Sequence, residues 1–97
     1  MSRATSTSVC CQRCGESFRV PELKAAEQSE VAELARAGQI AESIRLLRQI
    51  TGIEVRDANL IELHITRTPG VCNRCEEQLS ATGQIECPKC RAINLNW

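Results

Sequence analysis

The spacing of the cysteines constrains this chain more than any other feature. Six of its seven cysteines fall into three Cys-x-x-Cys pairs, and only eleven residues separate the last two pairs, in VCNRCEEQLSATGQIECPKC. A Cys-x-x-Cys turn offers two thiolates to one tetrahedral ion, with zinc–sulfur bonds of about 2.3 Å. The last two pairs therefore predict a closed, structural Zn²⁺ site with four ligands, Cys72, Cys75, Cys87 and Cys90.

Two other uses of these cysteines fit the sequence less well. A thioredoxin-type redox site needs only one pair inside a strand–helix unit, and no such unit is predicted around any of the pairs. Reduced cysteines without metal are the other alternative, but four cysteines at this spacing favour zinc. The segment SATGQIE between the pairs predicts a turn followed by a short strand.

Residues 72–90 resemble the short zinc ribbons that are common in bacterial proteins, with the form C-x-x-C, turn, C-P-x-C. The resemblance covers about the last quarter of the chain and implies short β-strands around the ion. The chain departs from the pattern at Glu76 and Arg91, which stand where such a cysteine turn often has glycine.

The N-terminal group, CCQRCGE, supplies only two well-spaced ligands, Cys11 and Cys14. Three completions are open: a ribbon interrupted by helices and closed by a later pair, the same residues of a second chain in a homodimer, or Cys10 together with His64. A metal-free, exposed pair is the remaining alternative. We expect Cys11 and Cys14 to bind a second zinc, because the ribbon already has its four thiolates.

Three helices are expected between the cysteine groups. Pro21 suits the first turn of a helix over residues 22–38, and Gly52 suits the end of a helix over 39–52. A third helix is expected over 55–65, before Pro69 and Gly70. The predicted core of the last two helices consists of apolar residues at helical spacing: Ile40, Ile44, Leu47, Ile50, Val55, Ala58 and Ile61.

These patterns together predict a small α+β fold, with a helical hairpin or three-helix segment followed by a C-terminal zinc ribbon of short β-strands. We expect a disordered tail at residues 1–9 and an N-terminal cysteine turn at 10–20. A helical region is expected at 21–68, and the zinc ribbon at 69–97.

Residues 38–62 resemble the helix-turn-helix part of the C-terminal domain of the bacterial ribosomal stalk protein, large-subunit protein seven/twelve. The matching positions are Ile44, Arg45, Arg48, Thr51, Gly52, Val55, Arg56, Asp57 and Ala58. In that family the hairpin contacts translation GTPases through basic residues, so the resemblance implies a partner contact through Arg45, Arg48 and Arg56. Glu54 and Asn59 depart from the family pattern, and a solvated helix face is the alternative interpretation of the arginines.

Charge and composition narrow the class of function. Twelve Lys and Arg residues balance twelve Asp and Glu residues, which argues against a nucleic-acid binder, and Phe18 and Trp97 are too few aromatics for a base-stacking surface. No Ser–His–Asp set or phosphate-binding loop is present, so no catalytic site is expected. Neither a signal peptide nor a membrane span is predicted, which favours the cytoplasm and reduced thiols.

We therefore expect a small cytoplasmic protein-interaction module, stabilised by zinc, with an unidentified protein partner and no membrane contact. The alternative is a zinc ribbon associated with the ribosome or with nucleic acid. In that case Arg74, Lys89 and Arg91, which surround the predicted zinc ligands, would contact phosphates.

Overall fold

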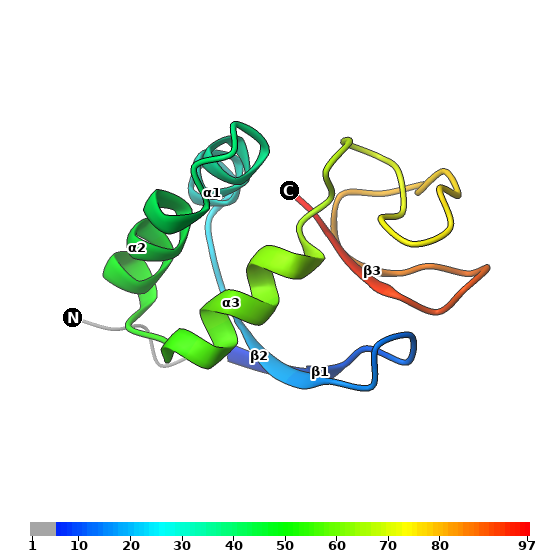
Figure 1. Cartoon of the computed structure of the whole chain (residues 1–97), viewed down its shortest axis with the longest axis horizontal. Helices are drawn as coiled ribbons and strands as arrows, with labels where there is room; N and C mark the ends of the chain where they lie inside the picture. Colours follow the sequence, from blue (N-terminus) through cyan, green and yellow to red (C-terminus); the bar gives the residue numbers. More distant parts are fainter. Residues whose placement is uncertain (1–5) are drawn as a thin grey trace.

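The computed structural model describes residues 6–97, which form three helices and two antiparallel sheets of two strands each (Figure 1). In chain order the elements are β1 (Ser6–Cys10), β2 (Ser17–Pro21), α1 (Ala25–Arg36), α2 (Ile40–Thr51), α3 (Val55–His64), β3 (Gly83–Glu86) and β4 (Ile93–Asn96). The predicted small α+β class is thus confirmed. Within residues 6–97, every helix falls short of the length and hydrophobicity that a bilayer-spanning segment requires.

The first hairpin corrects two predictions about the N-terminal part of the chain. Residues 6–9, expected in a disordered tail, belong to β1, which pairs with β2 from Ser6 opposite Pro21 to Cys10 opposite Ser17. Residues 1–5 of that expected tail lie outside the described residues. Pro21 ends β2 and does not start a helix. Helix α1 begins at Ala25, where the Glu27 carboxylate accepts a hydrogen bond from the Lys24 backbone N–H at 2.9 Å.

The helical hairpin buries the middle of its predicted core and exposes its ends. Leu47, Ala58 and Ile61 are fully buried. Ile44 and Ile50 are only partly buried. Ile40 and Val55 are 44% and 49% exposed, so their assignment to the core is wrong. Each is the first residue of its helix, α2 or α3, and therefore lies at the edge of the packed layer.

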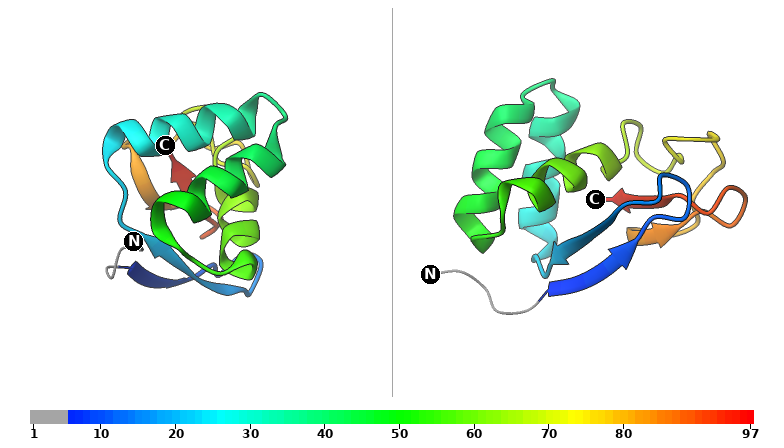
Figure 2. Two further views of the ribbon diagram at one scale, coloured as in Figure 1. Left: turned by 90° about the vertical axis from the view of Figure 1, so that its left-hand side faces the viewer. Right: turned by 60° about the horizontal axis from the view of Figure 1, so that its bottom comes forward.

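Helix α3 joins the two halves of the molecule. It packs against α2 on one side and against β2 and β4 on the other, and it runs through the centre of the view in Figure 1. Directly after α3, Ile65 forms a parallel bridge with Leu95 of β4. The Thr66 N–H also donates to the Leu95 carbonyl at 3.1 Å. These contacts hold the C-terminal sheet beside the end of α3 (Figure 2).

One polar contact lies inside the helical layer. Ser43 of α2 is fully buried, and its hydroxyl lies 2.9 Å from the Val31 carbonyl of α1. The same hydroxyl is hydrogen-bonded to Oε1 of Glu62 in α3. The other carboxylate oxygen, Oε2, is buried without a hydrogen-bond partner among the described residues. This contact links all three helices at one point.

Burial predicts different effects for two aliphatic residues of α2. Leu47→Ala should lower the free energy of unfolding by about 2–5 kcal/mol, because it leaves a cavity in the core. Ile40→Ala, the matched control on the exposed end of the same helix, should change it by no more than about 0.5 kcal/mol. Urea denaturation of both proteins, under the same conditions, measures both values. Equal losses for the two variants would contradict this packing.

Candidate metal centres

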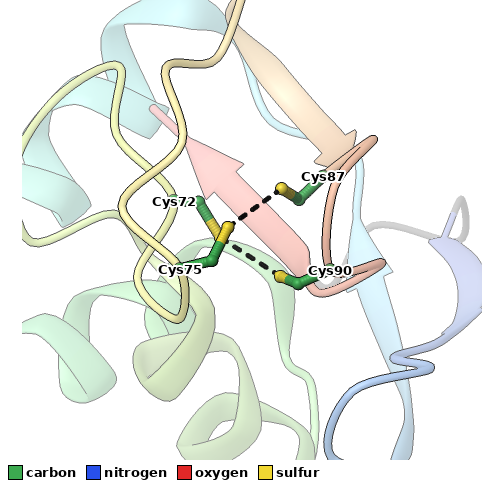
Figure 3. Close-up of side chains that lie close together, drawn as sticks. All are labelled: Cys72, Cys75, Cys87 and Cys90. Atoms are coloured by element: carbon green, nitrogen blue, oxygen red, sulfur yellow. Dashed lines mark hydrogen bonds between the residues drawn. The ribbon is translucent and has the colours of Figure 1, made fainter.

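The four cysteines of the C-terminal part converge on one point (Figure 3). We call Cys72, Cys75, Cys87 and Cys90 the tetrad; their sulfur atoms all lie within 4.8 Å of one another. The Sγ atoms are 3.7 Å apart for Cys72 and Cys90, and 3.5 Å apart for Cys75 and Cys87. Four sulfurs bound tetrahedrally to zinc lie about 3.8 Å apart, given bonds of about 2.3 Å. The tetrad therefore has nearly the spacing that a metal ion requires.

Each cysteine pair of the tetrad is held by the same backbone turn. In the first, the Cys72 N–H donates to the Glu77 carbonyl at 2.9 Å, and the Glu76 N–H donates back to the Cys72 carbonyl at 3.1 Å. In the second, the Cys87 N–H donates to the Ala92 carbonyl at 2.8 Å, and the Arg91 N–H donates to the Cys87 carbonyl at 2.9 Å. The second turn closes the β3–β4 hairpin. Asn94 of β4 holds the first turn beside it, because its side chain accepts from the Asn73 N–H at 3.0 Å and donates to the Cys72 Sγ at 3.4 Å.

The N-terminal pair has this turn as well. The Cys11 N–H donates to the Glu16 carbonyl at 3.0 Å, and the Gly15 N–H donates to the Cys11 carbonyl at 2.8 Å. The fourth residue after the first cysteine has a left-handed backbone in all three turns, with φ of 77° at Gly15, 64° at Glu76 and 66° at Arg91. Glycine adopts this conformation without strain, whereas Glu and Arg do not. The two departures from the zinc-ribbon pattern are therefore strained positions.

Cys11 and Cys14 gather with His64, forming what we call the N-terminal cluster. The three ligand atoms lie within 4.8 Å of one another, and the Cys14 Sγ is 3.5 Å from the His64 Nε2. His64 is the last residue of α3 and is buried. Cys10 does not join the cluster: it is exposed, whereas its neighbours Val9 and Cys11 are buried, as the alternation of a strand requires. Of the two residues predicted to complete the N-terminal site, His64 lies beside Cys11 and Cys14, and Cys10 does not.

The interrupted ribbon is not formed in the described residues. Both later pairs lie in the tetrad, and the N-terminal pair lies with His64. The helices between the cysteine groups therefore separate two clusters. Completion by a second chain stays a prediction.

Hydrogen bonds favour the thiolate form of Cys72. Burial raises the pKa of its thiol, but the N–H groups of Cys75 and Arg74, the amide of Asn94 and the thiol of Cys90 lower it from 9.0 to about 6. Burial raises the pKa of Cys90. Ionisation of every thiol in the tetrad therefore calls for a bound cation, as is usual for thiolate ligands.

The Cys11 thiol has a similar environment. Burial raises its pKa, but the backbone N–H groups of Ile93 and Cys14, together with the side chains of His64 and Cys14, lower it from 9.0 to about 6. The Ile93 N–H lies 3.4 Å from the Cys11 Sγ. The next residue, Asn94, donates from Nδ2 to the Cys72 Sγ, also at 3.4 Å. Two adjacent residues of β4 thus donate hydrogen bonds to one sulfur in each cluster.

Sequence reasoning missed Ile93 and Asn94 as thiolate donors. Neither belongs to a motif, and Ile93 lies more than 80 positions from the sulfur that it serves. A fully buried asparagine is the one signal that points to Asn94, because a buried amide needs partners. That signal exists only once burial is known.

The three hairpin arginines are exposed, and each interacts with another group of the chain. Arg45 pairs with Glu42 of the same helix at 3.0 Å, and Arg56 pairs with Glu16 at 3.3 Å. The Arg48 Nε donates to the Ile53 carbonyl at 3.2 Å. Their role in partner binding stays a prediction.

No protein-family model, curated protein or solved structure matches the chain. The resemblances to zinc ribbons and to the stalk-protein hairpin therefore stay predictions. The geometry of the tetrad shows that its four cysteines could bind a metal ion.

Backbone strain at Arg91 gives a test of the turn geometry. Arg91→Gly should raise the free energy of unfolding by about 0.5–1 kcal/mol, because glycine relieves the left-handed conformation. Lys89→Gly, at an exposed position of the same turn with no positive φ, should give no gain. Guanidinium denaturation of the two variants and the wild type measures both changes. A loss of stability in Arg91→Gly would contradict the assigned backbone.

Proposed function

We propose that the chain is a small protein-interaction module without catalytic activity, stabilised by Zn²⁺ bound to the tetrad. The observation that carries the proposal is the spacing of four sulfurs from two identical turns, close to that of a tetrahedral ion. Four thiolates close the coordination shell and leave no position for a reacting water. The zinc is therefore structural.

The small size of the ribbon explains why it needs a metal. Each strand of its sheet has four residues, and Cys72 and Cys87 are themselves fully buried members of the core around it. A sheet of two short strands has little stability by itself in water. In structural zinc sites the binding free energy is also folding free energy, so the ion supplies what the apolar core lacks.

Exposed apolar side chains support a protein partner. Ile40 of α2 is 44% exposed, and Leu63 of α3 is 67% exposed. Both line a single cavity of about 440 Å³, together with Arg36 and Arg67. Apolar groups flanked by arginine are typical of protein interfaces.

A zinc ribbon associated with the ribosome or with nucleic acid is the second candidate. Arg74, Lys89 and Arg91 are exposed around the tetrad. However, Lys89 pairs with Glu77 at 3.7 Å, and the chain has no net charge. Phosphate binding rests on clustered, unneutralised cations, so this candidate ranks second.

Removal of one tetrad ligand tests the structural zinc. Cys87→Ala should lose the tetrad metal and the hydrogen-exchange protection of β3 and β4, because the ribbon folds with its ion. Cys10→Ser is the matched control, since Cys10 is exposed and outside both clusters. Native mass spectrometry counts the metal. The proposal fails if Cys87→Ala keeps both the tetrad zinc and protected ribbon amides.

An RNA titration separates the two candidate functions. A fluorescent single-stranded RNA should not bind at physiological salt if the chain is a protein-interaction module. Affinity that falls steeply between 50 and 200 mM salt, and that Arg74→Ala/Arg91→Ala weakens, would instead support phosphate contacts. Arg45→Ala/Arg48→Ala is the control, because these arginines lie on the helical hairpin and not beside the tetrad.

A further inference from the structure

The N-terminal cluster differs from the tetrad in having three ligand side chains and not four. We infer that Cys11, Cys14 and His64 form a second metal centre, whose fourth coordination position is open and takes a small anionic ligand from solution. This inference goes beyond the structural zinc of the tetrad and does not depend on it.

The first support is geometric. Cys11 and Cys14 lie in the same hydrogen-bonded turn as both pairs of the tetrad, including the left-handed residue at Gly15. The Cys14 Sγ and the His64 Nε2 are 3.5 Å apart. A sulfur and a nitrogen bound tetrahedrally to zinc lie about 3.6 Å apart, given bonds of about 2.3 Å and about 2.05 Å. Cys14 and His64 therefore have nearly the spacing that a shared ion requires.

The second support is the orientation of His64. Its Nδ1 lies 2.6 Å from the Leu60 carbonyl, which can only accept a hydrogen bond, so Nδ1 carries the proton. The lone pair is then on Nε2, the atom that faces Cys14. Phe18, with its ring centroid 4.6 Å from that of His64, packs against the imidazole. Metal-bound histidines are typically held in this way, with the other ring N–H donating to a carbonyl.

The third support is the position of Cys11. Its side chain is fully buried, and its sulfur accepts a hydrogen bond from the Ile93 N–H at 3.4 Å. A buried sulfur that is oriented by a backbone donor is suited to act as a thiolate ligand. Cys11 and His64 therefore close the inner side of the centre.

The fourth position faces outward. No further Cys, His, Asp or Glu within residues 6–97 joins the cluster, and Cys10 lies on the other face of β1. Cys14 is only partly buried, and the space around the Gly15 Cα is open. A zinc ion with three protein ligands keeps a position for water or another small ligand. That position lies on the Cys14 side, where solvent can reach it.

Charge favours an anion there. The charges of two thiolates and a neutral imidazole sum to −2 and balance Zn²⁺, so the centre itself does not repel an anionic ligand. The positive charge of Arg74 acts on the side chain of Cys14. The same arginine would stabilise an anion bound beside Cys14. Only a small ligand fits, because the rest of the centre is buried.

Cobalt substitution tests both parts of the inference on the full chain. Native mass spectrometry should find two Co²⁺ ions per chain in the wild type and in Cys10→Ser, but one ion in Cys14→Ser. Sodium azide should then shift the visible cobalt absorption bands of the wild type and of Cys10→Ser. It should leave Cys14→Ser unchanged, since the remaining ion lies in the closed tetrad. His64→Gln, a second variant that keeps both cysteines, should bind the second ion at least tenfold more weakly.

Three results would overturn the inference. The first is a single ion in wild-type protein whose tetrad is loaded. The second is two ions with no response to azide, which means that the fourth position is filled. The third is a dimer in which Cys10→Ser abolishes the second ion, because a second copy would then supply the ligand. A tetrad that does not bind metal is recognised separately, because Cys14→Ser would then bind no cobalt.

Discussion

The convergence of four sulfurs in the tetrad is the constraint on which the C-terminal half depends. Two turns that are each held by local hydrogen bonds meet at the tetrad, where one ion could bind both. Once they meet, β4 is fixed, and β4 in turn supports the end of α3 through the bridge between Ile65 and Leu95. The segment that carries the tetrad thereby contacts the end of α3.

Strand β4 also relates the two clusters to each other. It directs the backbone of Ile93 toward Cys11 and the side chain of Asn94 toward Cys72. Asn94 is further held by the Asn73 N–H, which donates to its Oδ1 at 3.0 Å. The ligands are thus oriented by groups beyond the ligand set itself, which is common where thiolates must stay ordered. These donors make β4 part of both clusters.

Local features were predictable from the sequence, and long-range ones were not. Cysteine spacing predicted the tetrad, and helical periodicity predicted the ends of α2 and α3 to within one or two residues. The Ser/Thr-rich start gave no sign of β1, because that strand is stabilised by its pairing with β2. His64 was one of several candidates, since 50 residues separate it from Cys14 and only the packing of α3 on β2 brings them together.

The buried carboxyl of Glu62 responds to acid in the opposite sense to the buried thiols of Cys11 and Cys72. Burial raises its pKa above 4.5, partly offset by Ser43, so its stabilising effect is complete below pH 4.5 and is lost as pH rises through the raised value. The thiols of Cys11 and Cys72, with pKa values lowered to about 6, stabilise the fold above pH 9.0, and this effect is lost as pH falls through 6. Acidification therefore favours the buried carboxyl of Glu62 and disfavours the buried thiolates of Cys11 and Cys72.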